Sequence, residues 1–262
     1  MRGSDVTRYR TLTIEYTGHV AVVTMNRPEA RNAADAVMHR ELADVWPDLA
    51  ANREVRAVVL TGAGRAFSAG GDLPRMVETQ RDADVQDEVF DEARRIAHGM
   101  AGLPQPIVAA INGPAVGLGA SLVALSDLAV ASETSFLADP HLAVGLVPAD
   151  GTAMLWPLMA GLMRAKEFVL LGERIPARKA LEYGLVNRVV PAEDVQSTAL
   201  DLAHRLAAIP RRALQDTKRL MNAGSARVLG ALLEQAIAAE RQSLTSPEHI
   251  ARVQEMVEAQ RT

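Results

Sequence analysis

Cysteine is absent from all 262 residues of the sequence. This absence excludes disulfide bonds, thiolate metal sites and cysteine nucleophiles, and it is consistent with a reducing compartment. Aromatic residues amount to only 3% of the chain, so a surface that stacks nucleic-acid bases is not expected. No uninterrupted apolar run approaches the roughly 20 residues of a membrane-spanning helix, so we expect no membrane segment.

The composition that remains is that of an ordinary soluble protein, with 48% hydrophobic and 23% charged residues. The net charge of −4 provides no general attraction to nucleic acids or to anionic membranes. The N-terminal stretch, residues 1–10, is polar and lacks the apolar core of a signal peptide. We therefore expect a cytoplasmic enzyme or binding protein without a nucleic-acid or membrane partner.

The stretch from residue 106 to 132 organises the rest of the chain. Its pattern predicts a buried strand at 107–111, a glycine-rich turn that includes Gly117, a buried helix at 120–125 and a second strand at 128–131. Strand, turn, helix and strand form a βαβ-like unit. The start of its helix exposes unpaired backbone N–H groups, which are suited to an anion or to a developing oxyanion.

The same reasoning predicts the other elements and a division of the chain. Residues 74–90 are charged and poorly periodic, so we expect a mobile segment over a cleft. A β/α body is expected to about residue 195, followed by a helical region that lacks a core of its own and points to subunit contacts. Strands are predicted at 12–16, 20–25, 58–61, 135–137 and 186–190, and helices at 35–51, 91–103, 152–162, 163–171, 177–183, 193–208, 211–222, 227–245 and 247–260.

Two strand–turn units of the body resemble each other. Residues 58–62 are followed by Gly70-Gly71, and residues 109–113 are followed by Gly117. Each unit places small residues and a helix start just after a buried strand. The similarity is too weak for a repeat, but it suggests that two backbone N–H groups converge on one point.

Four segments, taken together, resemble the crotonase superfamily, also called the enoyl-CoA hydratase/isomerase family. They occur in the family's order and spacing, and the match extends over nearly the whole chain. The segments are Asn26-Arg27-Pro28 with Asn32-Ala33, residues 67–73 (FSAGGDL), residues 110–119 (AINGPAVGLG) and Gly184-Leu185-Val186-Asn187.

The resemblance implies an α/β fold, a crotonase-like spiral of ββα units in residues 1–195 with a C-terminal helical trimerisation region in 196–262. It also implies a homotrimer or a hexamer built as a dimer of trimers. The implied activity is that of a lyase or isomerase of fatty acid metabolism. The implied substrate is an acyl-CoA, so that coenzyme A is part of the substrate and no separate cofactor or metal is needed.

By similarity, the oxyanion hole consists of the backbone N–H groups of Gly71 and Leu118. Leu118 replaces the glycine that is usual there, and its N–H survives the change if the backbone conformation stays accessible. Two such donors stabilise the enolate of a thioester, typically by about 3–4 kcal/mol each. The other substrate- or CoA-binding candidates are Arg27, Arg31, Ser68, Ala69, Gly70, Asp72, Leu73, Gly117 and Ser121.

The chain departs from the family at its acid–base residues. The two glutamates of the hydratases fall on Ser121 and His141, so the two-carboxylate hydration machinery is missing. Asp150 follows His141 instead, and the same pair occurs in the β-diketone (oxocamphor) hydrolases, where it serves a retro-Claisen C–C cleavage. Trp156-Pro157 also resembles that subgroup, whereas the CoA-type loop at 68–72 does not. We expect Asp150 to orient or hold charge and His141 to move the proton.

Structural interpretations compete with these assignments. His141 is alternatively a hydrogen-bonded turn residue, Asp150 alternatively caps a helix from Thr152, and the two arginines, Arg27 and Arg31, face either solvent or CoA phosphates. A metal site is not expected, because His141 and Asp150 have no third ligand at a suitable spacing.

Two glycine motifs are incomplete. A dinucleotide loop after Gly117 has Leu122 in place of its third glycine, and a nucleophile elbow at Ser121 has Val123 in place of its closing glycine. Ser121 is therefore expected to line a pocket rather than to act as a nucleophile.

Three function classes follow. The first is an acyl-CoA enzyme of the hydratase/isomerase type that stabilises an enolate and moves protons with His141 and Asp150. The second is a hydrolase of a β-dicarbonyl C–C bond or of a thioester. The third is a non-catalytic binding member, including RNA binding, against which the charge and the few aromatic residues argue.

Overall fold

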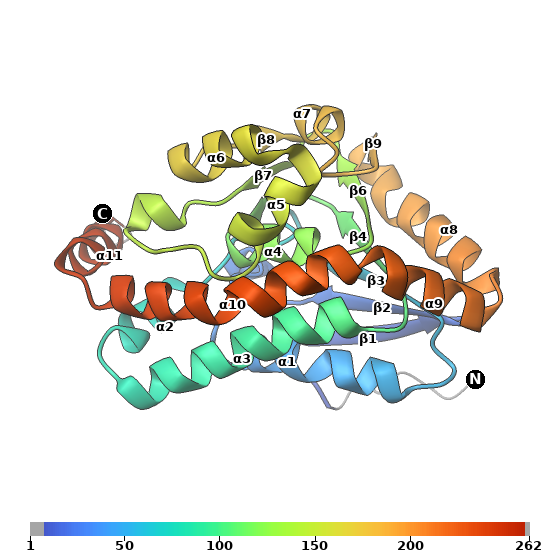
Figure 1. Ribbon diagram of the computed structural model, residues 1–262, viewed down its shortest axis with the longest axis horizontal. Coiled ribbons are helices and arrows are strands. Elements are labelled where there is room, and N and C mark those ends of the chain that lie inside the picture. The colour runs from blue at the N-terminus through green and yellow to red at the C-terminus, as the bar shows by residue number, and fades with distance from the viewer. Residues whose placement is uncertain (1–7, 260–262) are drawn as a thin grey trace.

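The computed structural model describes residues 8–259, so most of the polar N-terminal stretch lies outside the described residues (Figure 1). A six-stranded sheet has the order β1-β2-β3-β4-β6-β9, in which β1 is antiparallel to β2 and the other neighbours are parallel. A smaller sheet has the order β5-β7-β8. The strands are β1 (Leu12–Thr17), β2 (Val20–Met25), β3 (Ala57–Gly62), β4 (Ile107–Ile111), β5 (Ala115–Val116), β6 (Leu128–Ser132), β7 (Phe136–Ala138), β8 (Ile175–Pro176) and β9 (Arg188–Val190).

The helices follow the predicted order closely. Asp35 caps the first of them, as predicted, by accepting a hydrogen bond from the Met38 N–H at 2.9 Å. In the part of the chain that the structure describes, no helix has the length and apolarity needed to cross a membrane. The helices are α1 (Ala36–Ala51), α2 (Leu73–Thr79), α3 (Ala83–Gly102), α4 (Leu118–Ala124), α5 (Thr152–Ala160), α6 (Leu162–Leu171), α7 (Ala177–Glu182), α8 (Val195–Ala208), α9 (Arg211–Met221), α10 (Ala223–Leu244) and α11 (Pro247–Ala259), with 3-10 turns η1 (Pro28–Ala30), η2 (His141–Val144) and η3 (Ala192–Asp194).

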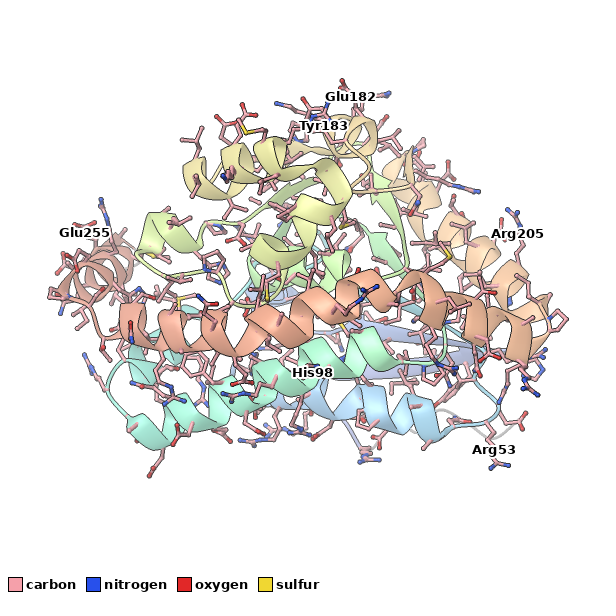
Figure 2. The ribbon with its side chains drawn as sticks, viewed as in Figure 1. Arg53, His98, Glu182, Tyr183, Arg205 and Glu255 are labelled. Carbon is pink, nitrogen blue, oxygen red and sulfur yellow. The ribbon has the colours of Figure 1, made fainter. Side chains whose placement is uncertain are left out.

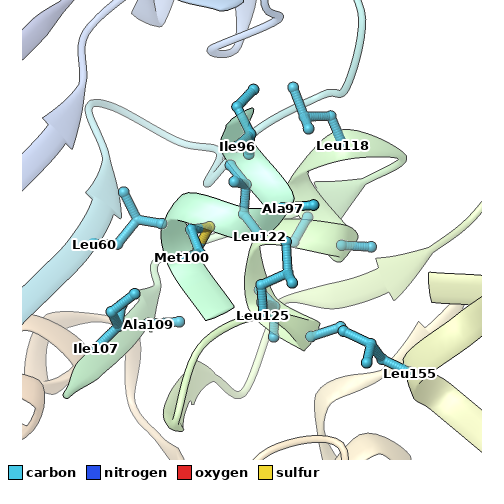
Figure 3. Close-up of a cluster of buried hydrophobic side chains, with 14 of the residues drawn as sticks. Leu60, Ile96, Ala97, Met100, Ile107, Ala109, Leu118, Leu122, Leu125 and Leu155 are labelled. Atoms are coloured by element: carbon cyan, nitrogen blue, oxygen red, sulfur yellow. The ribbon is translucent and has the colours of Figure 1, made fainter. Parts of the chain in front are cut away.

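The central strands are buried on both faces, because their alternating side chains enter two different hydrophobic clusters. One set packs toward α1, α3, α4 and α5 and contains Ala21, Val23, Val58, Leu60, Ile107 and Ala109. The other set packs under α8 and contains Val20, Val22, Ala57, Val59, Val108 and Ala110. Figure 3 shows part of the first cluster, where side chains from α3, α4, β3 and β4 meet.

Short bridges extend the smaller sheet and complete the predicted spiral. Ala34 pairs with Gly71, and Ser68 pairs with Ala115, each in parallel. The chain therefore repeats one unit several times. Each unit has a long strand in the main sheet, then a short strand or β-bridge in the smaller sheet, and then a helix. The predicted α/β spiral of ββα units is confirmed.

Residues 74–90, expected as a mobile segment over a cleft, do line a cavity, but they form regular helices. This segment forms α2 and the first two turns of α3, which begins at Ala83 rather than at residue 91. Asp82 caps α3 by accepting from the backbone N–H groups of Asp84 and Val85. The charges that obscured the periodicity form ion pairs, such as the one between Arg75 and Glu88 at 2.8 Å, which joins α2 to α3.

The helices after residue 195 pack on the body. Helix α8 covers one face of the main sheet, and α10 lies against α3 and α5 (Figure 1). Large apolar side chains remain exposed on α5, α6 and α9, which fits a subunit contact. The division at 195 and the trimer or hexamer stay predictions. The exposed side chains are Leu158, Met159, Leu162, Met163, Leu170, Leu171, Leu220 and Met221.

Candidate active site

A cavity of about 210 Å³ lies between two glycine-rich loops, the η2 turn and helices α1, α2, α10 and α11. Its wall combines apolar side chains with a small number of charged ones, as ligand sites commonly do. The charged side chains of the surface otherwise project outward, as Figure 2 shows for Arg53, Glu182, Arg205 and Glu255. The predicted site residues that line the cavity are Ala69, Gly70, Gly71, Asp72, Gly117, Leu118, His141 and Asp150.

The two glycine-rich loops approach each other through Gly70 and Gly117. Both have positive φ, at +93° and +53°. A Cβ at Gly70 would lie 2.9 Å from the Val116 carbonyl oxygen, and a Cβ at Gly117 would lie 3.7 Å from the Gly70 Cα and from the His141 Cε1. Because only glycine permits this approach, the loops bring Gly71, Leu118 and the His141 ring to one place.

The backbone N–H groups of Gly71 and Leu118 are open. Their chain neighbours pair, since the Ala34 N–H donates to the Gly70 carbonyl and the Asp72 N–H donates to the Ala34 carbonyl. Gly71 itself, between them, has no acceptor among residues 8–259, and the N–H of Leu118 at the start of α4 has none there either. Both residues line the cavity, so both donors are available to a ligand.

The leucine at position 118 is accommodated by the core. Its side chain is 7% exposed and belongs to the main hydrophobic cluster, together with Leu122 of the same helix (Figure 3). The side chain thus anchors the start of α4, while the N–H remains unpaired. Replacement of the family's usual glycine leaves the donor intact.

His141 begins η2, and its imidazole lies between two carboxylates. Nδ1 lies 2.5 Å from Oδ1 of Asp139 and Nε2 lies 3.5 Å from Oδ2 of Asp150. Asp139 is fully buried and also accepts a hydrogen bond from the Thr152 hydroxyl at the start of α5. The turn between β7 and α5 therefore holds the ring in a fixed orientation that faces Asp150.

The protonation of this group follows from its contacts. Burial by itself lowers the pKa of His141, but the contacts with Asp139 and Asp150 outweigh it and raise the pKa well above the usual value of a histidine. Burial would raise the pKa of Asp139, and its hydrogen bond with His141 reverses this and lowers it. At neutral pH the site therefore contains an imidazolium between carboxylates.

Glu240 on α10 joins the same group, which the sequence did not indicate. One oxygen each of Glu240 and Asp150 and one nitrogen of His141 lie within 4.8 Å of one another. Burial and the charge of Asp150 raise the pKa of Glu240 to about 8, so it is mostly protonated at pH 7. The expectation that His141 and Asp150 have no third candidate ligand is wrong, because α10 brings Glu240 to them from 90 residues later in the chain. The expected absence of a metal stays a prediction.

Comparisons with known proteins show the family of the chain. A family model described as enoyl-CoA hydratase/isomerase matches residues 15–261. The chain belongs to the enoyl-CoA hydratase/isomerase family. The predicted crotonase membership is thereby confirmed.

Proteins similar to this chain include enzymes that are named for different reactions. The crystal structure of an enoyl-CoA hydratase/isomerase from Mycobacterium paratuberculosis has a TM-score of 0.92 and 42% sequence identity, and the match covers 95% of this chain and 99% of that one. The 1,2-epoxyphenylacetyl-CoA isomerase of Escherichia coli is 34% identical over 217 residues, 82% of this chain and 83% of that enzyme. The 4-chlorobenzoyl coenzyme A dehalogenase-2 of an Arthrobacter species is 32% identical over 229 residues, 86% and 83% of the two chains. The two enzyme names specify different reactions, so the enoyl-CoA hydratase/isomerase family leaves the reaction open.

Several predicted substrate-binding residues do not line the cavity. The Arg27 guanidinium donates to the Ala33 carbonyl oxygen and pairs with Asp72 at 3.0 Å and Asp35 at 3.2 Å, so it braces the loop. Arg31 is exposed and stays a candidate for the CoA phosphates.

Three further candidates are internal. The Ser68 hydroxyl donates to the Asn32 carbonyl and accepts from the Gly70 N–H, so it shapes the loop rather than the pocket. Leu73 begins α2 and is buried. Ser121 is fully buried on α4, its hydroxyl has no partner within the described chain, and it does not line the cavity.

The alternative role of Asp150 as a helix cap is excluded, whereas His141 is indeed a hydrogen-bonded turn residue and its catalytic role stays a prediction. Helix α5 has Gly151 as its N-cap and no side-chain cap, so Asp150 does not cap it. Asp139 was missed although it lies two residues before His141, because an aspartate at a strand end is a common turn signal. Glu240, His39 and Arg75 of the cavity wall had no local signal at all.

Proposed function

We propose that this member of the enoyl-CoA hydratase/isomerase family binds an acyl-CoA and stabilises its thioester enolate, with proton transfer by the Asp150–His141 pair. The thioester oxygen would accept hydrogen bonds from the N–H groups of Gly71 and Leu118. Two fixed donors of this kind stabilise the charge that develops on the oxygen. Coenzyme A is part of the substrate, and no other cofactor enters the proposal.

The charges of the site favour the reverse of the roles expected from the sequence, because His141 as an imidazolium has no lone pair with which to accept a proton. Asp150 accepts the proton from the α-carbon of the acyl group, and the electrons of that C–H bond move to the thioester oxygen. His141, kept as an imidazolium by Asp139, stabilises the ionised Asp150 beforehand. Asp150 returns the proton to a carbon of the enolate, or the protonated Glu240 donates its proton there and regains one from Asp150; either route gives an isomerised thioester and restores the site.

The observation that carries this proposal is the position of His141. Its ring lies beside Gly117, and its Nε2 faces Asp150 at 3.5 Å, so the acid–base pair lies next to the two open N–H groups. The hydration of a short 2-enoyl-CoA is expected to be slow, because both glutamate positions of the hydratases carry other residues, Ser121 and His141.

A second candidate is hydrolysis of a β-dicarbonyl C–C bond. The observation in its favour is that the Asp150 carboxylate faces the His141 imidazolium at 3.5 Å and lines the cavity beside Gly71 and Leu118, where it can take a proton from an attacking water. Water would attack one carbonyl carbon, the C–C bond would break, and its electron pair would form an enolate that is then protonated. The products would be a carboxylic acid and a ketone or thioester.

Product analysis distinguishes the candidates. Wild type and the Asp150→Asn variant would be incubated separately with a 2-enoyl-CoA, a 3-enoyl-CoA, a β-ketoacyl-CoA and a free cyclic β-diketone. The proposal predicts conversion of the 3-enoyl-CoA to its conjugated isomer by the wild type only. Cleavage of the diketone alone, without conversion of any thioester, would establish the second candidate. Equal conversion by Asp150→Asn would contradict both.

A further inference from the structure

The last helix, α11, forms part of the cavity wall and has no part in the proposed chemistry. It follows α10 after a short joint at residues 245–246 and packs on η2 and on α2 (Figure 1). Met256 of α11 lines the cavity together with Leu244 of α10 and Val144 of η2. Since η2 begins at His141, α11 is attached both to the cavity wall and to the turn that holds the acid–base pair.

A buried histidine joins α11 to η2. His249, in the first turn of α11, is fully buried, and its Nδ1 lies 2.6 Å from the Val144 carbonyl oxygen. Because a carbonyl oxygen only accepts, Nδ1 carries the hydrogen. The other ring nitrogen, Nε2, is also buried and has no partner within the described chain. The docked position therefore favours the neutral ring, since a proton on Nε2 would be a buried donor without an acceptor.

The backbone of η2 fits closely against His249. Gly145, which ends η2 with a φ of +75°, leaves no space there: a Cβ on this glycine would lie 3.1 Å from both the Cα and the backbone nitrogen of His249. Val253, one turn further along α11, is also buried. We therefore expect a charged ring to leave this position together with the helix rather than by rotating in place.

No charged side chain is placed to compensate a proton on this ring. The titratable groups of the surrounding elements pair with other groups, face the His141 cluster or are exposed, and none of them bonds to His249 in residues 8–259. Burial lowers the pKa of His249 below its usual value, although the bond to Val144 acts in the opposite direction. The surrounding groups are His141 of η2, Asp150 of the loop to α5, Arg75 and Glu78 of α2, Glu240 and Arg241 of α10, and Glu248, Arg252 and Glu255 of α11.

We propose that α11 is a pH-dependent cover of the cavity, which stays docked on η2 while His249 is neutral and leaves it when this ring takes up a proton. An undocked helix exposes the ring to water, where its pKa is about 6.5. Because the docked ring binds a proton less readily, docking is most favourable above pH 6.5 and weakens as the pH falls below that value, by at most about 10-fold per pH unit. Undocking removes Met256 from the wall, so the cavity opens on acidification. The inference rests on the proposed function only in treating the cavity as the substrate site.

Hydrogen exchange measured by mass spectrometry tests the cover without any substrate. The wild-type chain would be labelled at pH 7.5, 6.5 and 5.5, with labelling times scaled for the intrinsic exchange rate, and protection would be read in peptides from residues 250–257. We expect the protection of α11 to fall by about 3- to 10-fold between pH 7.5 and 5.5, whereas that of α3 is kept. The upper figure corresponds to a docked ring that takes up no proton in this range. Unchanged protection of α11 would overturn the proposal.

Histidine NMR assigns the loss of protection to one ring. In protein with isotopically labelled histidine, the His249 signal is identified as the one missing from the His249→Asn variant, and it should titrate over the same pH range as the loss of protection. His98→Asn, which replaces an exposed histidine of α3, is the control and should retain the pH dependence. A His249 ring that takes up a proton while α11 stays protected, or that stays neutral while α11 undocks, would contradict the proposal.

A pair of glycine variants tests the docking contact at constant pH. Gly145→Ala should abolish the protection of α11 already at pH 7.5, because the new Cβ meets the His249 backbone. Gly172→Ala is the matched control: its φ of +64° is similarly positive, but the nearest atom to the new Cβ lies 3.8 Å away, so α11 should stay protected. Protection of α11 in Gly145→Ala would overturn the inferred contact. Since no measurement here uses a substrate, failure of the cover leaves the proposed function standing, and failure of the proposed reaction leaves the cover standing.

Discussion

Two polar regions occupy neighbouring turns of the spiral, and they differ in how completely their hydrogen bonds are made. In the first, Asn32 and Asn112 join the turns after β3: Asn32 Nδ2 donates to the carbonyls of Ala63 and Ala66, and Asn112 bonds Gly64 and Ala66. In the second, the cavity wall, the N–H groups of Gly71 and Leu118 are open.

This difference separates a region that fixes loop conformation from a region that can bind a ligand. Asn32 is fully buried and has a positive φ of 57°. The two hydrogen bonds that its side-chain amide donates are each 2.9 Å long. Such a satisfied group specifies one loop conformation and leaves nothing for a ligand. The cavity wall instead retains open donors and pairs charges whose pKa values are shifted, an arrangement typical of active sites. The first region holds the loops that the second region uses.

The largest effect is expected where the comparison predicts chemistry. Asp150→Asn and His141→Gln keep the size of the side chain and remove its acid–base function. Each should reduce turnover of the true substrate at least ~10²-fold, within the ~10²–10⁴ range of a lost acid–base group, with the fold retained. Asp150→Asn should leave the melting temperature within a few degrees, whereas His141→Gln should lower it, because the buried Asp139 loses its positive partner. Steady-state kinetics and circular dichroism measure both. Full activity in both variants would place the chemistry elsewhere.

A large stability effect is expected in the region without chemistry. Asn32→Asp keeps the oxygen that accepts from the Arg27 N–H but loses both amide donors and buries a charge. We expect a loss of about 3 kcal/mol in the free energy of unfolding, measured with urea. Asn112→Asp is the matched control and should lose less, because Asn112 is only partly buried. An equal loss of stability in both variants would show that burial does not explain the effect at Asn32.

Glu240 should give the site a distinctive pH dependence. Its folded pKa of about 8 exceeds the unfolded value of about 4.3, so its contribution to stability is complete below pH 4 and disappears as the pH rises through 8. Glu240→Gln mimics the protonated form and does not titrate. The stability of wild type relative to this variant should therefore fall by about 1–2 kcal/mol between pH 5 and 9, a figure reduced for partial exposure. A constant difference would mean that Glu240 has an ordinary pKa.

The smallest effect is expected at Ser121. Its buried hydroxyl has no partner in the described chain and no contact with the cavity, so Ser121→Ala should change turnover less than ~10-fold and stability by less than about 1 kcal/mol. Ser68→Ala, which loses two hydrogen bonds in the loop before Gly71, should have the larger effect. Complete inactivation by Ser121→Ala, with a trapped acyl-enzyme, would favour a serine nucleophile.

Local patterns predicted the elements well where one physical signal dominated. The strand at 107–111 is a continuous apolar run because both of its faces are buried, and the Asp35 cap is a short-range hydrogen bond. The prediction failed at 74–90, where charges pair between α2 and α3 instead of facing solvent. A pairing of that kind depends on helix positions that no local window contains.

The sequence by itself determined the buried strands and the glycine turns, because these depend on residues close in the chain. Its four motifs carried the resemblance to the family, and that resemblance implied the spiral and the pairing of His141 with Asp150. Only the tertiary structure decided which side chains share the cavity. It placed Arg27 and Ser68 in hydrogen bonds within the loops and Ser121 in the core, so that none of the three lines the cavity. It added Glu240 and His39, which helices α10 and α1 bring to the cavity from distant positions in the chain. The physical reason is that burial and charge compensation are properties of neighbours in space.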